Sequence, residues 1–277
     1  QVKQRFGAQL EFLTRQQAAG ESRKRDVSVP DGTGPFPAVI LVRGGSWVGG
    51  DKTGGPRKGN MAPMHDALTA GGIAWFSINY RLAPQHRYPA GIEDVETAIR
   101  WIKAHAAEYH VDPQRLALSG DSSGGHYVAL AAVRADASTR VAAIVPFFTP
   151  FDFVAGTKRR NAVTDTLAGL FGRSTVDEET YKILHDASPL YFVKPGLPPF
   201  LILQGTADTA VIPQQAVDME ARLRAAGVPV ERIMVEGGAH GMTNWTQFMP
   251  DYKERVVAWL NKTLAASTSA SAPAAKP

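Results

Sequence analysis

Short apolar runs recur along this chain, and segments whose apolar residues are spaced three or four positions apart separate them. The runs occupy residues 38–42, 73–78, 116–118, 142–147, 200–203 and 232–235. A short, continuously apolar run is typical of a strand that is buried on both faces of a parallel sheet. We therefore predict a buried strand at each of these positions.

The intervening segments have the spacing expected of amphipathic helices, most clearly at 91–110. The apolar face of that segment is formed by Ile92, Val95, Ile99, Ile102 and Ala106. Similar patterns predict helices at 61–69, from Gly125 onward, at 213–226 and at 244–265. Because strands and helices alternate, we expect an α/β fold with a mostly parallel sheet, covered by helices on both faces.

Three segments depart from this alternation. Residues 149–196 lie between two predicted strands and are too long for a simple connection, so we interpret them as a lid with at most two short helices. Residues 1–25 are polar, and their sparse apolar positions fit one amphipathic helix. Residues 266–277 are of low complexity and are predicted to form a flexible tail. The rest, 1–265, is predicted to form one domain that includes the lid.

Composition and charge exclude several classes of function. The chain has 277 residues, of which 44% are hydrophobic and 20% charged, as in a globular protein. The net charge is +4 and the basic residues are scattered, which favours an ordinary solvated surface over nucleic-acid binding. No apolar run has the length of a membrane span. The oligomeric state cannot be predicted from these features.

The sequence contains no cysteine, which excludes disulfides, thiolate catalysis and cysteine-ligated metals. Together with a start at Gln1 in place of Met, this fits a secreted or periplasmic protein, with the cytoplasm as the alternative.

The strongest chemical signal lies at 116–132, which reads LALSGDSSGGHYVALAA. A predicted strand meets the pattern G-x-S-x-G at 120–124, and a predicted helix follows it. Such a turn needs glycine on both sides and holds the central serine in a strained conformation with its hydroxyl exposed. We interpret Ser122 as a nucleophile. Ser123 is the competing candidate, but its position in the motif makes its backbone N–H the useful group.

A serine hydroxyl needs a base to take its proton and an acid to orient that base. His240 follows the strand at 232–235 directly and is the predicted base, whereas His126 lies one helical turn after Ser122 and points along the helix. Asp208 follows the strand at 200–203 and is the predicted acid. Glu236 is the alternative, since it also ends a strand.

Backbone N–H groups are the usual means of stabilising the oxyanion of an acyl-transfer reaction. The loop with Gly44, Gly45 and Ser46 follows the first predicted strand, and the N–H of Ser123 begins the helix after Ser122. The oxyanion loop, the nucleophile, the acid and the base therefore all follow strand ends. In a parallel sheet those ends share one edge, where open α/β folds bind their ligands. We expect no metal and no cofactor in this chemistry.

Two stretches carry a family resemblance. Residues 120–125, GDSSGG, with 80–84, YRLAP, resemble the hormone-sensitive-lipase group of α/β-hydrolase esterases. Residues 188–211 and 235–241 are similar to one branch, the bifunctional acetylxylan and feruloyl esterases. The resemblance covers about 35–265. It implies the α/β-hydrolase fold, the chain order Ser122, Asp208, His240 for the triad, and the loop after the first strand with Ser123 as the oxyanion hole.

One loop departs from the family pattern. Arg43-Gly44-Gly45-Ser46-Trp47 stands where the family usually has His-Gly-Gly-Gly-Trp. The backbone donors survive this change, although a positive φ at Ser46 would cost energy because of its Cβ. Arg43 is either a structural residue of the loop or a group that attracts an acidic substrate.

These observations predict a serine carboxylic-ester hydrolase that works through an acyl-enzyme. The short lid favours a small acyl pocket for short-chain or aromatic acyl groups, with Trp47 and Trp245 as candidate substrate contacts. The resemblance extends this to acetyl or feruloyl esters of plant polysaccharides, so the expected partner is a small-molecule or polysaccharide-linked ester. The alternatives are an amide hydrolase, such as an arylformamidase, and an inactive hydrolase-like binding protein.

Overall fold

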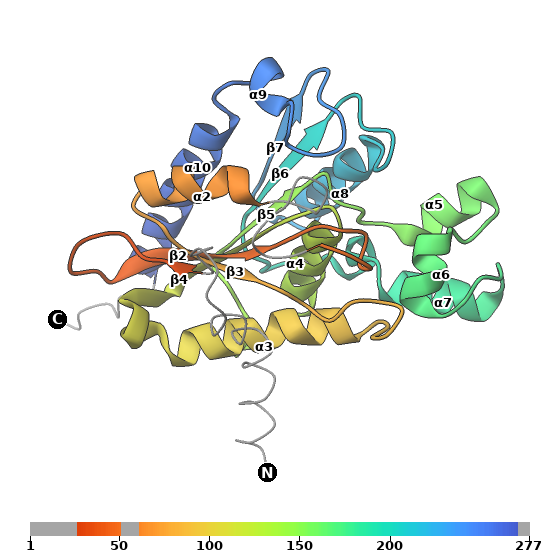
Figure 1. Cartoon of the computed structure of the whole chain (residues 1–277), viewed down its shortest axis with the longest axis horizontal. Coiled ribbons are helices and arrows are strands. Elements are labelled where there is room, and N and C mark those ends of the chain that lie inside the picture. The colour runs from red at the N-terminus through yellow and green to blue at the C-terminus, as the bar shows by residue number, and fades with distance from the viewer. Residues whose placement is uncertain (1–26, 51–60, 271–277) are drawn as a thin grey trace, which may run out of the picture.

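The computed structural model describes residues 27–50 and 61–270, excepting the side chains of 266–270. Its centre is a seven-stranded sheet with the order β1-β3-β2-β4-β5-β6-β7 (Figure 1). The strands are β1 (Val27–Ser28), β2 (Phe36–Val42), β3 (Ala74–Ile78), β4 (Val111–Asp121), β5 (Ala143–Phe147), β6 (Phe200–Gly205) and β7 (Val230–Val235). β1 pairs antiparallel with β3, and the other pairings are parallel. The prediction of a mostly parallel sheet is therefore confirmed.

Every predicted apolar run coincides with one of these strands, apart from shifts of their ends. β3, β5 and β6 are buried at every position, as expected where helices cover both faces of a parallel sheet. The sequence analysis missed β1, because two residues are too few to show a hydrophobic period.

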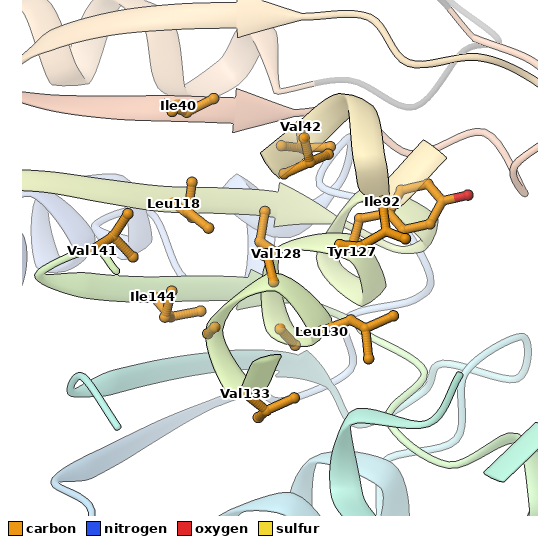
Figure 2. Packing of buried hydrophobic residues seen from close by; sticks show 14 of the residues in the cluster. Ile40, Val42, Ile92, Leu118, Tyr127, Val128, Leu130, Val133, Val141 and Ile144 are labelled. Carbon is orange, nitrogen blue, oxygen red and sulfur yellow. The ribbon is translucent and has the colours of Figure 1, made fainter. Parts of the chain in front are cut away.

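Helices cover both faces of the sheet (Figure 1). On one face lie α3 (Ala90–Ala104), α4 (Ser123–Arg134) and α8 (Gln214–Ala225), and on the other lie α2 (Ala62–Ala70), α9 (Trp245–Phe248) and α10 (Tyr252–Ala270). Alternate residues of β2 divide between the two cores: Ile40 and Val42 face α4, and Leu41 faces the α10 side. Figure 2 shows the α4 core, where Val128 lies against Leu118.

Some predicted helix boundaries were wrong. The predicted helix 91–110 ends at Ala104, and a 3-10 helix, η2 (Ala106–Tyr109), follows it. The segment predicted as one helix at 244–265 is divided into α9 and α10. α10 also runs to Ala270, past the predicted start of the tail at 266. The predicted helix in 1–25 and the rest of the tail lie outside the described residues.

The lid contains more helix than predicted. Its helices are α5 (Phe153–Arg160), α6 (Asp165–Phe171), α7 (Glu178–Asp186) and the 3-10 helix η3 (Pro189–Phe192). Each of the three α-helices begins at a side-chain cap, because the oxygens of Asp152, Thr164 and Asp177 accept from the backbone N–H group three residues on. Figure 1 shows α5, α6 and α7 grouped at one end of the sheet.

Candidate active site

Ser122 lies in the sharp turn between β4 and α4, with φ 52 and ψ −116, a strained conformation for a residue with a Cβ. The flanking glycines are required by close backbone contact. A Cβ on Gly124 would lie 2.0 Å from the carbonyl oxygen of Val42, and one on Gly120 would lie 2.6 Å from the carbonyl carbon of Gly124. The turn thus has the form of a nucleophile elbow.

A chain of two hydrogen bonds joins the predicted triad. His240 Nε2 lies 3.1 Å from Ser122 Oγ, and His240 Nδ1 lies 2.8 Å from Asp208 Oδ2. The carboxylate of Asp208 is buried, and its Oδ1 accepts from the backbone N–H groups of Ala210 and Val211, both at 2.9 Å. An ionised carboxylate can only accept, so His240 Nδ1 donates, which leaves Nε2 free to accept the serine proton.

Neither alternative side chain has a comparable position. Glu236 is exposed, and the acid that reaches His240 is Asp208. Ser123 is wholly buried, and its hydroxyl lies 3.1 Å from the hydroxyl of Tyr80, so it does not reach the site as a nucleophile. Its backbone N–H remains at the start of α4, beside Ser122.

The loop after β2 lies directly against the elbow, and its N–H groups divide into two kinds. The N–H of Gly44 donates to Asp121 Oδ1 at 2.7 Å. The N–H groups of Gly45 and Ser46 donate to no other group in 27–50 or 61–270. The inclusion of Gly44 in the oxyanion hole is therefore wrong, because its proton is already used. The remaining candidate donors are Gly45, Ser46 and Ser123.

Comparison with known proteins identifies the family of the chain. The model of the BD-FAE family matches residues 26–223. The chain belongs to the BD-FAE family. This family is one of the hormone-sensitive-lipase-like α/β-hydrolases, so the resemblance read from the sequence and the predicted fold class are both confirmed.

Two curated proteins and one solved structure are examples of proteins similar to this chain. The probable carboxylic ester hydrolase LipM of Mycobacterium tuberculosis is 34% identical over 207 residues, covering 70% of this chain and 46% of LipM. The carboxylesterase NlhH of the same organism is 32% identical over 230 residues, covering 78% of this chain and 69% of NlhH. A truncated carbohydrate esterase from gut microbiota has a TM-score of 0.73 at 26% identity, covering 90% of this chain and 94% of that chain. The chain spans about half the length of the first curated relatives, 46% of LipM and 54% of LipC.

The loop after β2 has a strained backbone, and the side chain of Arg43 holds it in place. Ser46 and Trp47 have φ values of 54 and 63, in the left-handed region that side chains disfavour. The buried guanidinium of Arg43 donates to the carbonyl oxygens of Gly44 and Gly49, at 3.1 and 2.5 Å, and also contacts the side chain of Asn79. Arg43 is therefore the structural residue of the two alternatives, because its charge is not exposed to a substrate.

Tyr80 and His126 contact side chains of this loop and so support it. The sequence analysis assigned neither residue a role in the loop. The ring of Tyr80 lies 4.5 Å from the guanidinium carbon of Arg43, and burial raises the pKa of its phenol. His126 is wholly buried: its Nδ1 accepts from Trp47 Nε1 at 3.1 Å and its Nε2 donates to the carbonyl oxygen of Ala187 at 2.7 Å. The sequence signal for Tyr80 was the YRLAP stretch, which was used only for the resemblance.

The two tryptophans proposed as substrate contacts are buried. Trp47 is 6% exposed and packs edge-on against Phe153 of the lid. Trp245 is 0% exposed; it donates to the carbonyl oxygen of Ala239 at 3.0 Å and packs against Phe148. The structure does not support substrate contact by either ring, because their faces are already covered. Trp245 instead supports the loop that carries His240.

The described part of the chain contains neither a membrane-spanning helix nor a cluster of metal ligands. Over 27–50 and 61–270, no helix has the length and apolar character needed to cross a bilayer. In the same part of the chain, no three histidine, aspartate or glutamate side chains gather in the manner of metal ligands.

Proposed function

We propose that this chain hydrolyses carboxylic esters through a covalent acyl-enzyme on Ser122. The observation that carries this proposal is the hydrogen-bonded chain from Ser122 through His240 to the buried carboxylate of Asp208. The names of the curated relatives support it, since LipM and NlhH are both described as ester hydrolases.

In the first half of the reaction, Ser122 Oγ attacks the ester carbonyl carbon while His240 Nε2 takes the hydroxyl proton. The oxyanion that forms is stabilised by the N–H groups of Gly45, Ser46 and Ser123. When the tetrahedral intermediate collapses, the bond to the alcohol oxygen breaks and His240 returns its proton to that oxygen. The alcohol leaves, and the acyl group stays on Ser122.

In the second half, a water molecule takes the place of the alcohol. His240 Nε2 removes a proton from the water as its oxygen attacks the acyl carbon. When this second tetrahedral intermediate collapses, the bond between the acyl carbon and Ser122 Oγ breaks, His240 returns the proton to Oγ, and the carboxylic acid leaves. Asp208 accepts the hydrogen bond from His240 Nδ1 throughout, which fixes the tautomer and stabilises the imidazolium.

The proposed acyl groups are short or aromatic, including the acetyl and feruloyl esters of plant polysaccharides. The compact lid supports this, because Phe153 packs directly on Trp47, and a Cβ at position 169 of α6 would lie 4.0 Å from a Val48 side-chain carbon. The carbohydrate esterase among the similar structures supports the polysaccharide part of the proposal.

The test is kcat/KM across 4-nitrophenyl esters from acetate to palmitate, with methyl ferulate, acetylated xylan and a matched anilide alongside. Each methylene that the pocket cannot accept should forfeit roughly 0.8 kcal/mol of binding, so the values should fall steeply beyond butyrate. Ser122→Ala provides the background rate. A maximum at long acyl chains would contradict the small-pocket proposal, and faster turnover of the anilide than of its ester would favour the amide hydrolase.

A further inference from the structure

Gln204 is a buried polar residue beneath the acid of the triad. It lies near the end of β6, is 0% exposed, and precedes the turn that carries Asp208. The side-chain nitrogen Nε2 lies near three oxygens: the carbonyl oxygens of Gly205 and Val211, both at 3.1 Å, and Asp208 Oδ2 at 3.2 Å. Asp208 Oδ2 is also the oxygen that accepts from His240 Nδ1.

The chemistry of these neighbours fixes the orientation of the amide. Two carbonyl oxygens and a carboxylate oxygen can only accept hydrogen bonds, so the group that faces them must be the amide NH₂. With the amide turned over, the Gln204 carbonyl oxygen would face three acceptors. The assignment of Nε2 toward Asp208 therefore follows from the donor set around it.

This orientation leaves the other end of the amide without a partner. Gln204 Oε1 is buried and accepts no hydrogen bond from the described residues. An unpaired buried acceptor is destabilising, and an apolar side chain of similar volume, such as methionine, would fill the space without that cost. Packing alone therefore gives no reason for glutamine at this position, whereas its NH₂ group does, because it donates toward Asp208 and toward the carbonyl oxygens of Gly205 and Val211.

We propose that Gln204 is a positioning residue that holds the Asp208 carboxylate in register with His240. This inference rests on the proposed serine esterase function. Backbone N–H groups hold Asp208 Oδ1, and Gln204 holds Oδ2, so hydrogen bonds to both oxygens oppose rotation of the carboxylate. Among residues 27–50 and 61–270, removal of Gln204 leaves His240 as the one side-chain donor to Oδ2. The carboxylate is then less constrained at the moment when His240 must carry a positive charge.

The experiment combines Gln204→Met with Asp208→Asn in a double-mutant cycle, measured with 4-nitrophenyl acetate. In the wild-type background, Gln204→Met should lower kcat at least tenfold with KM changed less than about twofold, because hydrogen bonds to charged groups have effects of that size. In the Asp208→Asn background the carboxylate is absent, so the same substitution should change kcat by less than about twofold. Rates are corrected with Ser122→Ala.

Ile202→Val, in the same strand and wholly buried, is the matched control for a general loss of packing, and its kcat should stay within about twofold of wild type. If Gln204→Met does not fold, Gln204→Asn replaces it, because the shorter side chain withdraws the donor from Asp208. An equal reduction of kcat in both backgrounds, or no reduction in the wild-type background, would overturn the positioning role. Absence of turnover in the wild-type protein would instead reject the proposed function.

Discussion

Acid should weaken the fold through the imidazole of His126. The ring is neutral in the native protein, because Nδ1 accepts from the indole N–H of Trp47 and Nε2 donates to the carbonyl oxygen of Ala187. A proton on Nδ1 would point at the indole proton. Burial is the largest cause that lowers the pKa of His126 to about 4; the charge of Arg134 adds to it, and the hydrogen bond to Ala187 opposes it.

The size of the effect follows from the two pKa values. The imidazole in the unfolded chain has its ordinary pKa of 6.5, and the native ring has a pKa of about 4. Between these values the unfolded state binds the proton and the native state does not, so stability is lost as the pH falls through this range and is unaffected above it. With about 1.4 kcal/mol per pKa unit, lowering the pH from about 7.5 to 4.5 should reduce the free energy of unfolding by about 2.5 kcal/mol.

The measurement is urea unfolding at those two pH values for the wild type and for His126→Phe, which keeps a ring but cannot take a proton. The free energy of unfolding that the variant loses between the two pH values should be smaller than the wild-type loss by about 2.5 kcal/mol. His65, another imidazole whose pKa burial lowers, titrates in both proteins and cancels. The hydrogen bond from the Ser138 side chain is the largest cause that lowers the pKa of Asp136 to about 2, so the native carboxyl takes up its proton below this pH range. Equal losses in the two proteins would refute the reasoning.

Four further outcomes are expected. The value of kcat/KM should fall on acidification, because a protonated His240 cannot accept the serine proton, and a constant value from about pH 5 to 8 would count against His240 as the base. Gly124→Ala, whose Cβ would lie 2.0 Å from the Val42 oxygen, should cost about 1–3 kcal/mol in urea unfolding and most of the activity. Gly72→Ala should lower the free energy of unfolding by about 1 kcal/mol and leave the activity unchanged, because Gly72 has φ +72 but open space around it. Ser46→Gly should raise the free energy of unfolding by about 1 kcal/mol with activity kept, because it removes a Cβ at φ 54 and leaves the N–H.

The sequence predicted the sheet and the convergence of Ser122, Asp208 and His240 for the same physical reason. Strands buried on both faces leave continuous apolar runs, and a parallel sheet brings the residues that follow those runs to one edge. The elbow was visible because close contact at Gly120 and Gly124 admits no side chain.

The errors concern contacts between segments that are distant in the sequence. Trp47 and Trp245 precede or follow catalytic loops, but nothing in a single sequence shows that Phe153 and Phe148 cover them. The N–H of Gly44 looked available because its acceptor, Asp121, lies at the end of β4, 77 residues further along the chain. The number of lid helices was underestimated because these helices are short. Their N-termini are marked only by single capping residues, which are common in loops as well.

The most direct test of the central claim is to label the protein with a fluorophosphonate and locate the adduct by peptide mass spectrometry. The account predicts one adduct on Ser122, loss of ester hydrolysis in proportion to labelling, and no adduct in Ser122→Ala. Ser123→Ala is the matched control and should still be labelled, because its hydroxyl is buried against Tyr80. Labelling of Ser123 in place of Ser122, or full hydrolysis by Ser122→Ala, would contradict the account.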